Sequence, residues 1–176
     1  MLKKLILAGR AFLVAGVIAG GVLMVGMFPT HLRLESSVVI HSDAARIAPF
    51  VNDLHRWQEW STWSPKYDAQ SRDEYAGPNA GVGAIWNWSG SEQRTARFEI
   101  TNVEANVIRV DVSKIGLVHT ANFEFTKEPA GTRVTWESLG MGPLFVAWFT
   151  GGATDRHDKD VETSLNNLKR VVEAAQ

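Results

Sequence analysis

Apolar and polar side chains alternate with a period of two along most of the chain between residues 82 and 138. In the stretch "VIRVDVS", Ile108, Val110 and Val112 share one face, and the residues between them are charged or polar. The stretches "VGAIWNWSG", "RTARFEITNV", "HTANFEFTKE" and "TRVTWESLG" repeat the alternation, and turns such as "WSGSEQ" and "EPAGT" separate them. Because successive side chains of a strand point to opposite faces, this pattern predicts an antiparallel meander with one buried and one solvated face.

The segments on either side of the meander complete a single α+β domain. A strand is predicted over residues 32–41, a short helix over 42–54 and a further strand near 71–75; Ser42 is the expected N-cap, and Pro49 is expected to kink the helix or end its first turn. A long C-terminal helix is predicted from an apolar stripe at helical spacing: Val161, Leu165, Leu168 and Val172. The expected architecture is a curved antiparallel sheet of about six to seven strands packed on this helix.

A long apolar segment precedes this domain. Residues 5–28 read "LILAGRAFLVAGVIAGGVLMVGMF" and contain one charge, Arg10, near the start. About 20 apolar residues cross a bilayer, so we predict one transmembrane helix, with residues 1–30 as an anchor and 31–176 as the globular domain. A cleaved signal peptide and a buried core helix are the alternatives, but the run exceeds a usual signal core and no A-x-A site follows it.

The charge distribution bears on location and partners. Lys3 and Lys4 precede the apolar segment and favour a cytoplasmic N-terminus, so we expect an extracytoplasmic domain, periplasmic in a Gram-negative cell. The formal net charge is −1, and the residues after 28 hold 15 basic and 19 acidic side chains. This balance gives no basic field for nucleic acid, and the absence of cysteine excludes disulfides and thiolate metal sites.

Five stretches, in order, cover most of residues 35–172: "SSVVIHSDAARIAPFVNDLHRWQEWSTWSP", "YAGPNAGVGAIWNWSG", "FEITNVEANVIRVDV", "AGTRVTWESLG" and "SLNNLKRVVE". Their order and spacing resemble the START-like superfamily, also called SRPBCC or helix-grip proteins, which includes the polyketide cyclase/dehydrase and lipid-transport families. The resemblance implies that the sheet wraps the C-terminal helix and leaves an apolar ligand chamber between them. It does not imply which ligand, because this fold serves many functions.

Three of the seven tryptophans, Trp57, Trp60 and Trp63, fall within "HRWQEWSTWSP" at positions 55–65. Helical spacing places Trp57 and Trp60 on one face, whereas Trp63 lies off that stripe. Three roles are open for these rings: they plug one end of the core, they wall the mouth of the chamber, or they contact the membrane surface.

Further candidates for lining the chamber share the inward parity of the strands or fall in the apolar stretch "PLFVAWF" at 143–149. That stretch is a candidate gate, because glycines at 140, 142, 151 and 152 bracket it, and a buried connector is the alternative. Lining a ligand and filling the core remain equal possibilities for the strand residues. These further candidates are Trp86, Trp88, Val110, Phe123, Phe125, Trp136, Leu144 and Trp148.

A search for catalytic groups finds no set that makes an enzyme. No histidine pair has metal-ligand spacing, and neither a G-x-S-x-G motif nor a glycine-rich phosphate loop occurs, so we expect no metal and no cofactor. His119 shares the parity of Phe123, and it and Arg97 are the polar candidates for the chamber, although an arginine at such a position usually points to solvent. Glu137 has the parity of the outer face.

These features predict a membrane-anchored protein that binds a hydrophobic small molecule or lipid between the sheet and the C-terminal helix, without chemistry. One alternative is an enzyme of the cyclase/dehydrase kind, which needs polar side chains converging in the chamber. The other is a protein-interaction module with a filled core. The oligomeric state does not follow from the sequence.

Overall fold

The computed structural model describes residue 21 and residues 29–114, 117–143 and 151–175 of the chain. The strands are β1 (Pro29–Ile40), β2 (Arg72–Ala76), β3 (Ile85–Ser89), β4 (Thr95–Val103), β5 (Val107–Lys114), β6 (Leu117–Glu128) and β7 (Gly131–Pro143). The helices are α2 (Ala44–Asn52), α3 (Trp57–Trp60) and α5 (Gly151–Ala174), with short 3-10 turns η1 (Leu54–Arg56) and η2 (Ser91–Gln93).

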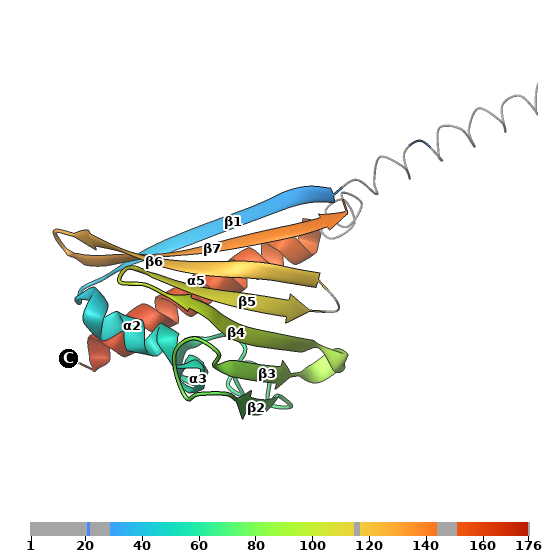
Figure 1. Cartoon of the computed structure of the whole chain (residues 1–176), viewed down its shortest axis with the longest axis horizontal. Coiled ribbons are helices and arrows are strands. Elements are labelled where there is room, and N and C mark those ends of the chain that lie inside the picture. The colour runs from blue at the N-terminus through green and yellow to red at the C-terminus, as the bar shows by residue number, and fades with distance from the viewer. Residues whose placement is uncertain (1–20, 22–28, 115–116, 144–150, 176) are drawn as a thin grey trace, which may run out of the picture.

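One antiparallel sheet contains these seven strands in the spatial order β1-β7-β6-β5-β4-β3-β2. From β2 to β7 each strand pairs with the next along the chain, as the predicted meander requires. The first strand closes the other edge by pairing with the last, from Pro29 opposite Pro143 to Ile40 opposite Thr132. Helix α5 runs along one face of the sheet, and its C-terminal end lies beside α2 (Figure 1). The predicted sheet and C-terminal helix are confirmed.

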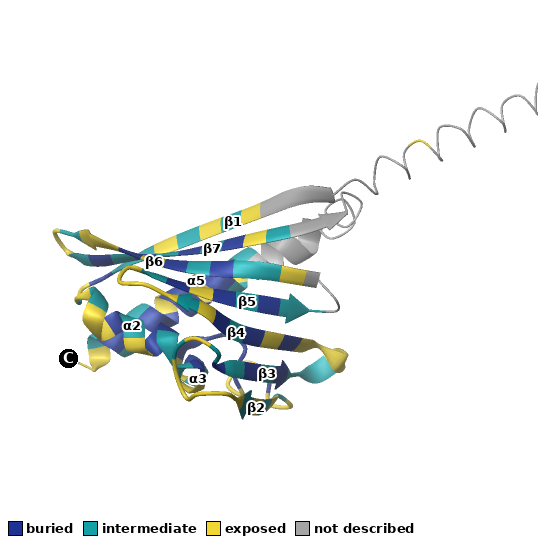
Figure 2. Cartoon of the chain, viewed as in Figure 1, coloured by how far each residue is buried: buried dark blue, intermediate teal, exposed yellow. Residues whose placement is uncertain are grey.

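Buried and exposed side chains alternate along the central strands, as the period of two predicts (Figure 2). The register aligns the buried positions of neighbouring strands into rows that run across the inner face. Two of these rows consist of residues no more than 2% exposed: Trp86, Phe98 and Val112 in one, and Ile108, Phe123 and Trp136 in the other. Facing them, α5 buries the predicted stripe: Val161, Leu165, Leu168 and Val172. The core therefore lies between the sheet and α5.

Two predicted boundaries near the start of the domain are wrong. The first strand begins at Pro29 rather than residue 32, because residues 29–31 also pair with β7. The N-cap of α2 is Asp43 rather than Ser42. The backbone N–H of Ser42 donates to the carbonyl of Ile40 at 2.8 Å, so Ser42 belongs to the turn before the helix. Pro49 lies inside α2, which continues to Asn52.

The glycines at the start of the predicted gate belong to a strand. Gly140 and Gly142 lie within β7, opposite Leu32 and Thr30, so the strand includes both glycines that were expected before the gate. Leu144 and Trp148 lie outside the described residues, and a gating role for this stretch stays a prediction.

The predicted anchor, residues 5–28, also lies outside the described residues apart from Gly21. Among the residues that the structure does describe, no helix combines the length and the apolar character that crossing a bilayer requires. The anchor therefore stays a prediction.

Candidate ligand-binding site

Trp57 and Trp60 fasten α3 to the end of α2. Their ring centroids lie 4.8 Å apart. The indole N–H of Trp57 donates to the carbonyl of Val51 at 2.9 Å, and that of Trp60 donates to the carbonyl of Phe50 at 3.0 Å. Both acceptors lie in the last turn of α2, where carbonyls lack intrahelical partners. These two tryptophans therefore have a structural role at one end of the core.

The ring of Trp57 is the centre of an aromatic cluster between the sheet and the short helices. It is fully buried, and its centroid lies 5.6 to 6.1 Å from four other rings. Those four rings are Trp86, Phe98, Phe123 and Trp136. Aromatic pairs at such separations attract one another beyond their burial. At this end of the molecule, rings fill the core.

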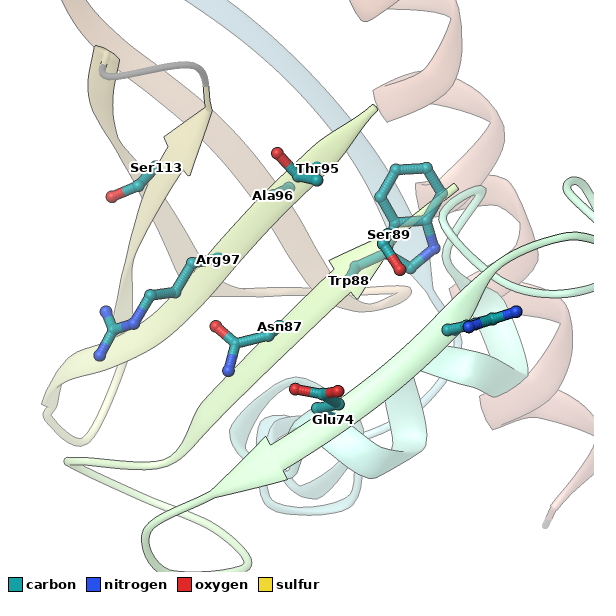
Figure 3. Close-up of a pocket in the computed structure, with 9 residues that line it drawn as sticks. Glu74, Asn87, Trp88, Ser89, Thr95, Ala96, Arg97 and Ser113 are labelled. Atoms are coloured by element: carbon teal, nitrogen blue, oxygen red, sulfur yellow. The ribbon is translucent and has the colours of Figure 1, made fainter. Parts of the chain in front are cut away.

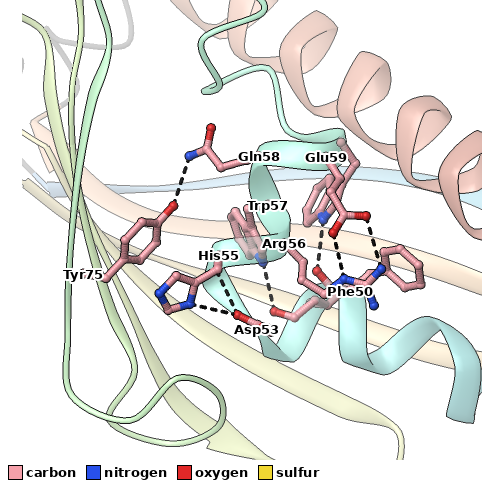
Figure 4. Close-up of polar contacts among 10 residues, drawn as sticks. Phe50, Asp53, His55, Arg56, Trp57, Gln58, Glu59 and Tyr75 are labelled. Atoms are coloured by element: carbon pink, nitrogen blue, oxygen red, sulfur yellow. Dashed lines mark hydrogen bonds and ion pairs between the residues drawn. The ribbon is translucent and has the colours of Figure 1, made fainter.

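Polar contacts cover the outside of this cluster (Figure 4). The guanidinium of Arg56 lies 3.4 Å from the ring centre of Phe50 and pairs with Glu59 at 2.9 Å. The ring of His55 stacks on Tyr75 at 4.0 Å, and burial raises the pKa of that tyrosine. These contacts order the segment on the outside of the cluster.

Trp63 stands apart from the other two, as its spacing predicted. It follows α3, and its ring centroid lies 4.7 Å from that of Phe98 and 6.4 Å from that of Trp136. The ammonium of Lys114 lies 4.1 Å from its ring centre. Trp63 therefore joins the aromatic core to a charged side chain.

The indole N–H groups divide the buried tryptophans into two kinds. Trp57, Trp60 and Trp86 all donate to protein acceptors, Trp86 to Asp73 at 2.8 Å. Trp88 and Trp136 are 5% and 2% exposed, yet their N–H groups have no acceptor among the described residues. Leaving a buried donor without an acceptor costs about 1–3 kcal/mol. These two indoles are therefore available to a polar atom of a bound molecule.

Lys114 is an inward-facing charged residue that the sequence analysis did not identify. It is the last residue of β5 and lies two residues after Val112, so it faces the same side of the strand as Ile108, Val110 and Val112. Burial lowers its pKa to about 8 from the ordinary 10.5, and nearby Asp160 partly opposes this shift. The alternation contained the signal, because the same parity that buries Val112 also turns Lys114 inward.

The two polar candidates from the sequence lie on opposite faces. His119 is half-buried on the inner parity of β6, aligned with Val112 and Gly140. Arg97 is exposed on the outer face, where it pairs with Glu99 at 2.5 Å. The inward positions beside Arg97 belong to Ala96 and Phe98, so the prediction that Arg97 faces the chamber is wrong.

The other strand candidates lie on the inner face as predicted: Val110 is fully buried, and Phe125 is 5% exposed. Glu137 faces outward, also as predicted, and pairs with Arg33 at 2.6 Å. Within the described ranges, no three side chains come together as a metal site. Whether the inward residues bind a ligand stays a prediction.

Three surface hollows are lined by described residues. One of about 360 Å³ lies over β2, β3 and β4, where Glu74, Asn87 and Arg97 project from the sheet (Figure 3). A second, of about 430 Å³, lies between α2 and the β4–β5 turn, and a third, of about 370 Å³, lies beside the β6–β7 turn. None of the three is lined by a residue of α5. The first is also lined by Trp88 and Ala96, and the second by Ile108 and Phe125, which belong to the inner face of the sheet.

A curved antiparallel sheet with an aromatic inner face, packed on a long C-terminal helix, defines a helix-grip protein. Residues 31–173 match the family described as polyketide cyclase/dehydrase and lipid transport, and the chain belongs to that family. A comparison with curated proteins gave no match.

Solved structures share the fold at low sequence identity. A protein of unknown function from Staphylococcus aureus, SA2116, has a TM-score of 0.64 at 9% identity, covering 84% of this chain and 96% of that one. The solution structure of the KanY protein has a TM-score of 0.62 at 16% identity, with coverages of 82% and 99%. DynU16, a putative protein in the dynemicin biosynthetic locus, has a TM-score of 0.59 at 14% identity, with coverages of 82% and 48%.

Proposed function

We propose that the protein binds a hydrophobic small molecule between the inner face of its sheet and α5, and holds it without chemical conversion. The family supports an apolar ligand. The observation that carries the proposal is the pair of buried indole N–H groups of Trp88 and Trp136, which have no acceptor among the described residues. Most buried donors in a protein core have an acceptor, as the indoles of Trp57 and Trp60 do. A ligand hydroxyl, carbonyl or carboxylate oxygen supplies the missing acceptor.

The proposal includes attachment to a membrane through residues 5–28, with the domain outside the cytoplasm. Its support is the length of the apolar run and the lysines before it. A reporter fused after Gln176 tests the orientation: an enzyme that is active only outside the cytoplasm should be active in this fusion. Activity only of a cytoplasmic reporter would overturn the orientation.

A direct binding test uses the full-length chain in a mild maltoside detergent. The probe is 11-bromoundecan-1-ol, a neutral apolar molecule whose bromine quenches tryptophan emission on contact. We expect saturable quenching and a one-to-one complex by native mass spectrometry. The Trp88→Phe variant should bind the probe several-fold more weakly, because the hydroxyl loses an indole donor.

Trp86→Phe is the matched control, because the N–H of Trp86 is already engaged by Asp73. This variant should bind the probe as the wild type does. Absence of saturable quenching together with absence of a complex would contradict the binding function and favour a protein-interaction module with a filled core.

The second candidate function is an enzyme of the cyclase/dehydrase kind. The inward position of His119 on β6 favours it, because an imidazole can act as a general acid or base. The test incubates polyketide-like aromatic precursors with the wild type and with His119→Gln. Turnover by the wild type that His119→Gln loses would replace the binding function with catalysis.

A further inference from the structure

The inner face of the sheet ends in a lysine. Lys114 is the last residue of β5, two residues after Val112, which pairs with Phe98 on β4. Ala96, two residues before Phe98, pairs with Trp88 on β3, so the alternation places Lys114, Ala96 and Trp88 at the same level of the inner face. Neighbouring strands lie about 4.8 Å apart, so the backbones of Lys114 and Trp88 are about 10 Å apart, and the inward residue on the strand between them is the small Ala96. Two long side chains, one a cation and one a hydrogen-bond donor, therefore flank a small residue.

The ammonium of Lys114 is poorly satisfied by the protein. Its contact is the face of the Trp63 ring at 4.1 Å, and among the described residues it makes no hydrogen bond and no ion pair closer than 4.0 Å. The half-buried Lys169 differs, because its ammonium donates to the carbonyl of Val39 at 2.8 Å and lies 3.8 Å from Glu173. Burying an ammonium without a hydrogen-bonding anion is costly, so Lys114 is poised for an anion that arrives from outside the chain.

The charges around Lys114 come from several elements. Asp160 on α5 raises its pKa, whereas Arg94, just before β4, lowers it. The guanidinium of Arg94 is held by Asp68 at 2.8 Å, a carboxylate that also accepts from the backbone N–H of Ser91. His119 shares the inner face on β6. The charge of Arg94 is thus already neutralised by Asp68, whereas the ammonium of Lys114 faces inward without a paired carboxylate among the described residues.

Resting on the binding function above, we propose that Lys114 is the counter-ion for a carboxylate carried by the apolar ligand. One carboxylate oxygen pairs with the ammonium, and the indole N–H of Trp88 donates to the other. The apolar body of the ligand then lies against the rings of Trp63 and Trp136.

The donors at this position fit a carboxylate better than a phosphate. One ammonium and one buried indole N–H match a single negative charge spread over two oxygens. A phosphate monoester carries nearly two charges and is usually bound by several cations or backbone donors. The ligand class is therefore an amphipathic acid, such as a fatty acid or an aromatic acid with an apolar body.

The experiment compares two probes that differ only in the head group: 11-bromoundecanoic acid and 11-bromoundecan-1-ol. Quenching of tryptophan emission is measured at pH 7 on the full-length chain in maltoside detergent. We expect the wild type to bind the acid at least tenfold more tightly than the alcohol. Lys114→Met should abolish this preference and leave alcohol binding within twofold.

Two further variants control for charge and for folding. Lys114→Arg keeps the cation and should retain most of the preference, whereas Lys127→Met removes an exposed charge on β6 and should leave it unchanged. The denaturation midpoint of each variant verifies that it is folded. Raising the pH from 7 to 9.5 should weaken acid binding as Lys114 loses its proton, with alcohol binding constant.

The possible failures are distinguishable. Equal binding of both probes by the wild type, or an equal loss of both in Lys114→Met, would overturn the role of Lys114 and leave the binding function standing. Binding of neither probe would overturn the binding function and this inference with it.

Discussion

The carboxylate of Glu173, in the last turn of α5, accepts a hydrogen bond from the backbone N–H of His41 at 2.9 Å. Its oxygen also lies 2.8 Å from the Nδ1 atom of the His41 ring. His41 directly follows β1, so a single side chain joins the end of the helix to the edge strand of the sheet. One turn earlier, Lys169 makes a second link to this strand through the carbonyl of Val39.

Glu173→Gln should lower the free energy of unfolding by about 1 kcal/mol at pH 7. The hydrogen bond from His41 lowers the pKa of Glu173 below the ordinary 4.5, so its contribution is present above that value and is lost as the pH falls through the folded-state pKa. Urea denaturation at pH 7 and pH 3 should give a difference between wild type and variant that shrinks at the lower pH. Glu162→Gln, at an exposed position of the same helix, should have no effect at either pH.

Replacing a tryptophan by phenylalanine should cost more where the indole N–H is engaged. Trp60→Phe leaves the carbonyl of Phe50 without its donor, whereas Trp88→Phe removes an N–H that has no acceptor among the described residues. Both variants lose similar volume, so the difference isolates the hydrogen bond. We expect Trp60→Phe to be the less stable by about 1–2 kcal/mol in denaturant unfolding. Equal losses would contradict the division of the tryptophans into structural and available donors.

Lys114→Met should stabilise the protein by about 2 kcal/mol at pH 7, because burial disfavours the charged lysine in the folded state. Between the folded pKa of about 8 and the ordinary 10.5, the unfolded chain binds more protons than the folded one. The wild type therefore gains stability as the pH rises through this window, and the variant should not. Thermal or urea unfolding at pH 7 and pH 10 measures both effects, and a destabilised variant at pH 7 would show that the lysine is satisfied by the protein.

Gly131→Ala should be strongly destabilising. The residue has a φ of +137°, and an added Cβ would lie 2.1 Å from the carbonyl oxygen of Ile40. Gly81 also has a positive φ, of +83°, but no atom lies within 4 Å of an added Cβ. We expect a loss of more than about 2 kcal/mol for Gly131→Ala and about 1 kcal/mol for Gly81→Ala in denaturant unfolding. Similar losses for both would mean that backbone conformation, and not the contact with Ile40, decides the cost.

Local patterns predicted the elements of this fold well. Alternation along the strands identified the buried face, and the helical stripe from Val161 to Val172 identified the helix that packs on it. The spacing of Trp57, Trp60 and Trp63 separated the first two from the third. These features depend on periodicities that neighbouring residues already contain.

Features that depend on distant partners escaped the sequence reading. The first strand extends back to Pro29 because β7 pairs with it, although more than 100 residues separate them. The difference between the indoles of Trp60 and Trp88 depends on whether a carbonyl from another element lies in reach. Lys114 is the exception, because the alternation along β5 already indicated that its side chain faces inward. The residue was overlooked because a charged side chain at the end of an apolar series usually faces solvent.

Because β1 pairs with β7, the end of the sheet that carries Lys114 also carries the start of β1. Lys114 pairs with Leu117 on β6, two residues before His119, which pairs with Gly140 on β7. Gly142, two residues after Gly140, pairs with Thr30 of β1. Thr30 follows the apolar segment by two residues. If that segment crosses a bilayer, the tether has almost no slack, and the lysine end of the sheet is held next to the lipid headgroups. An amphipathic acid leaving the membrane would then have only a short path to its counter-ion.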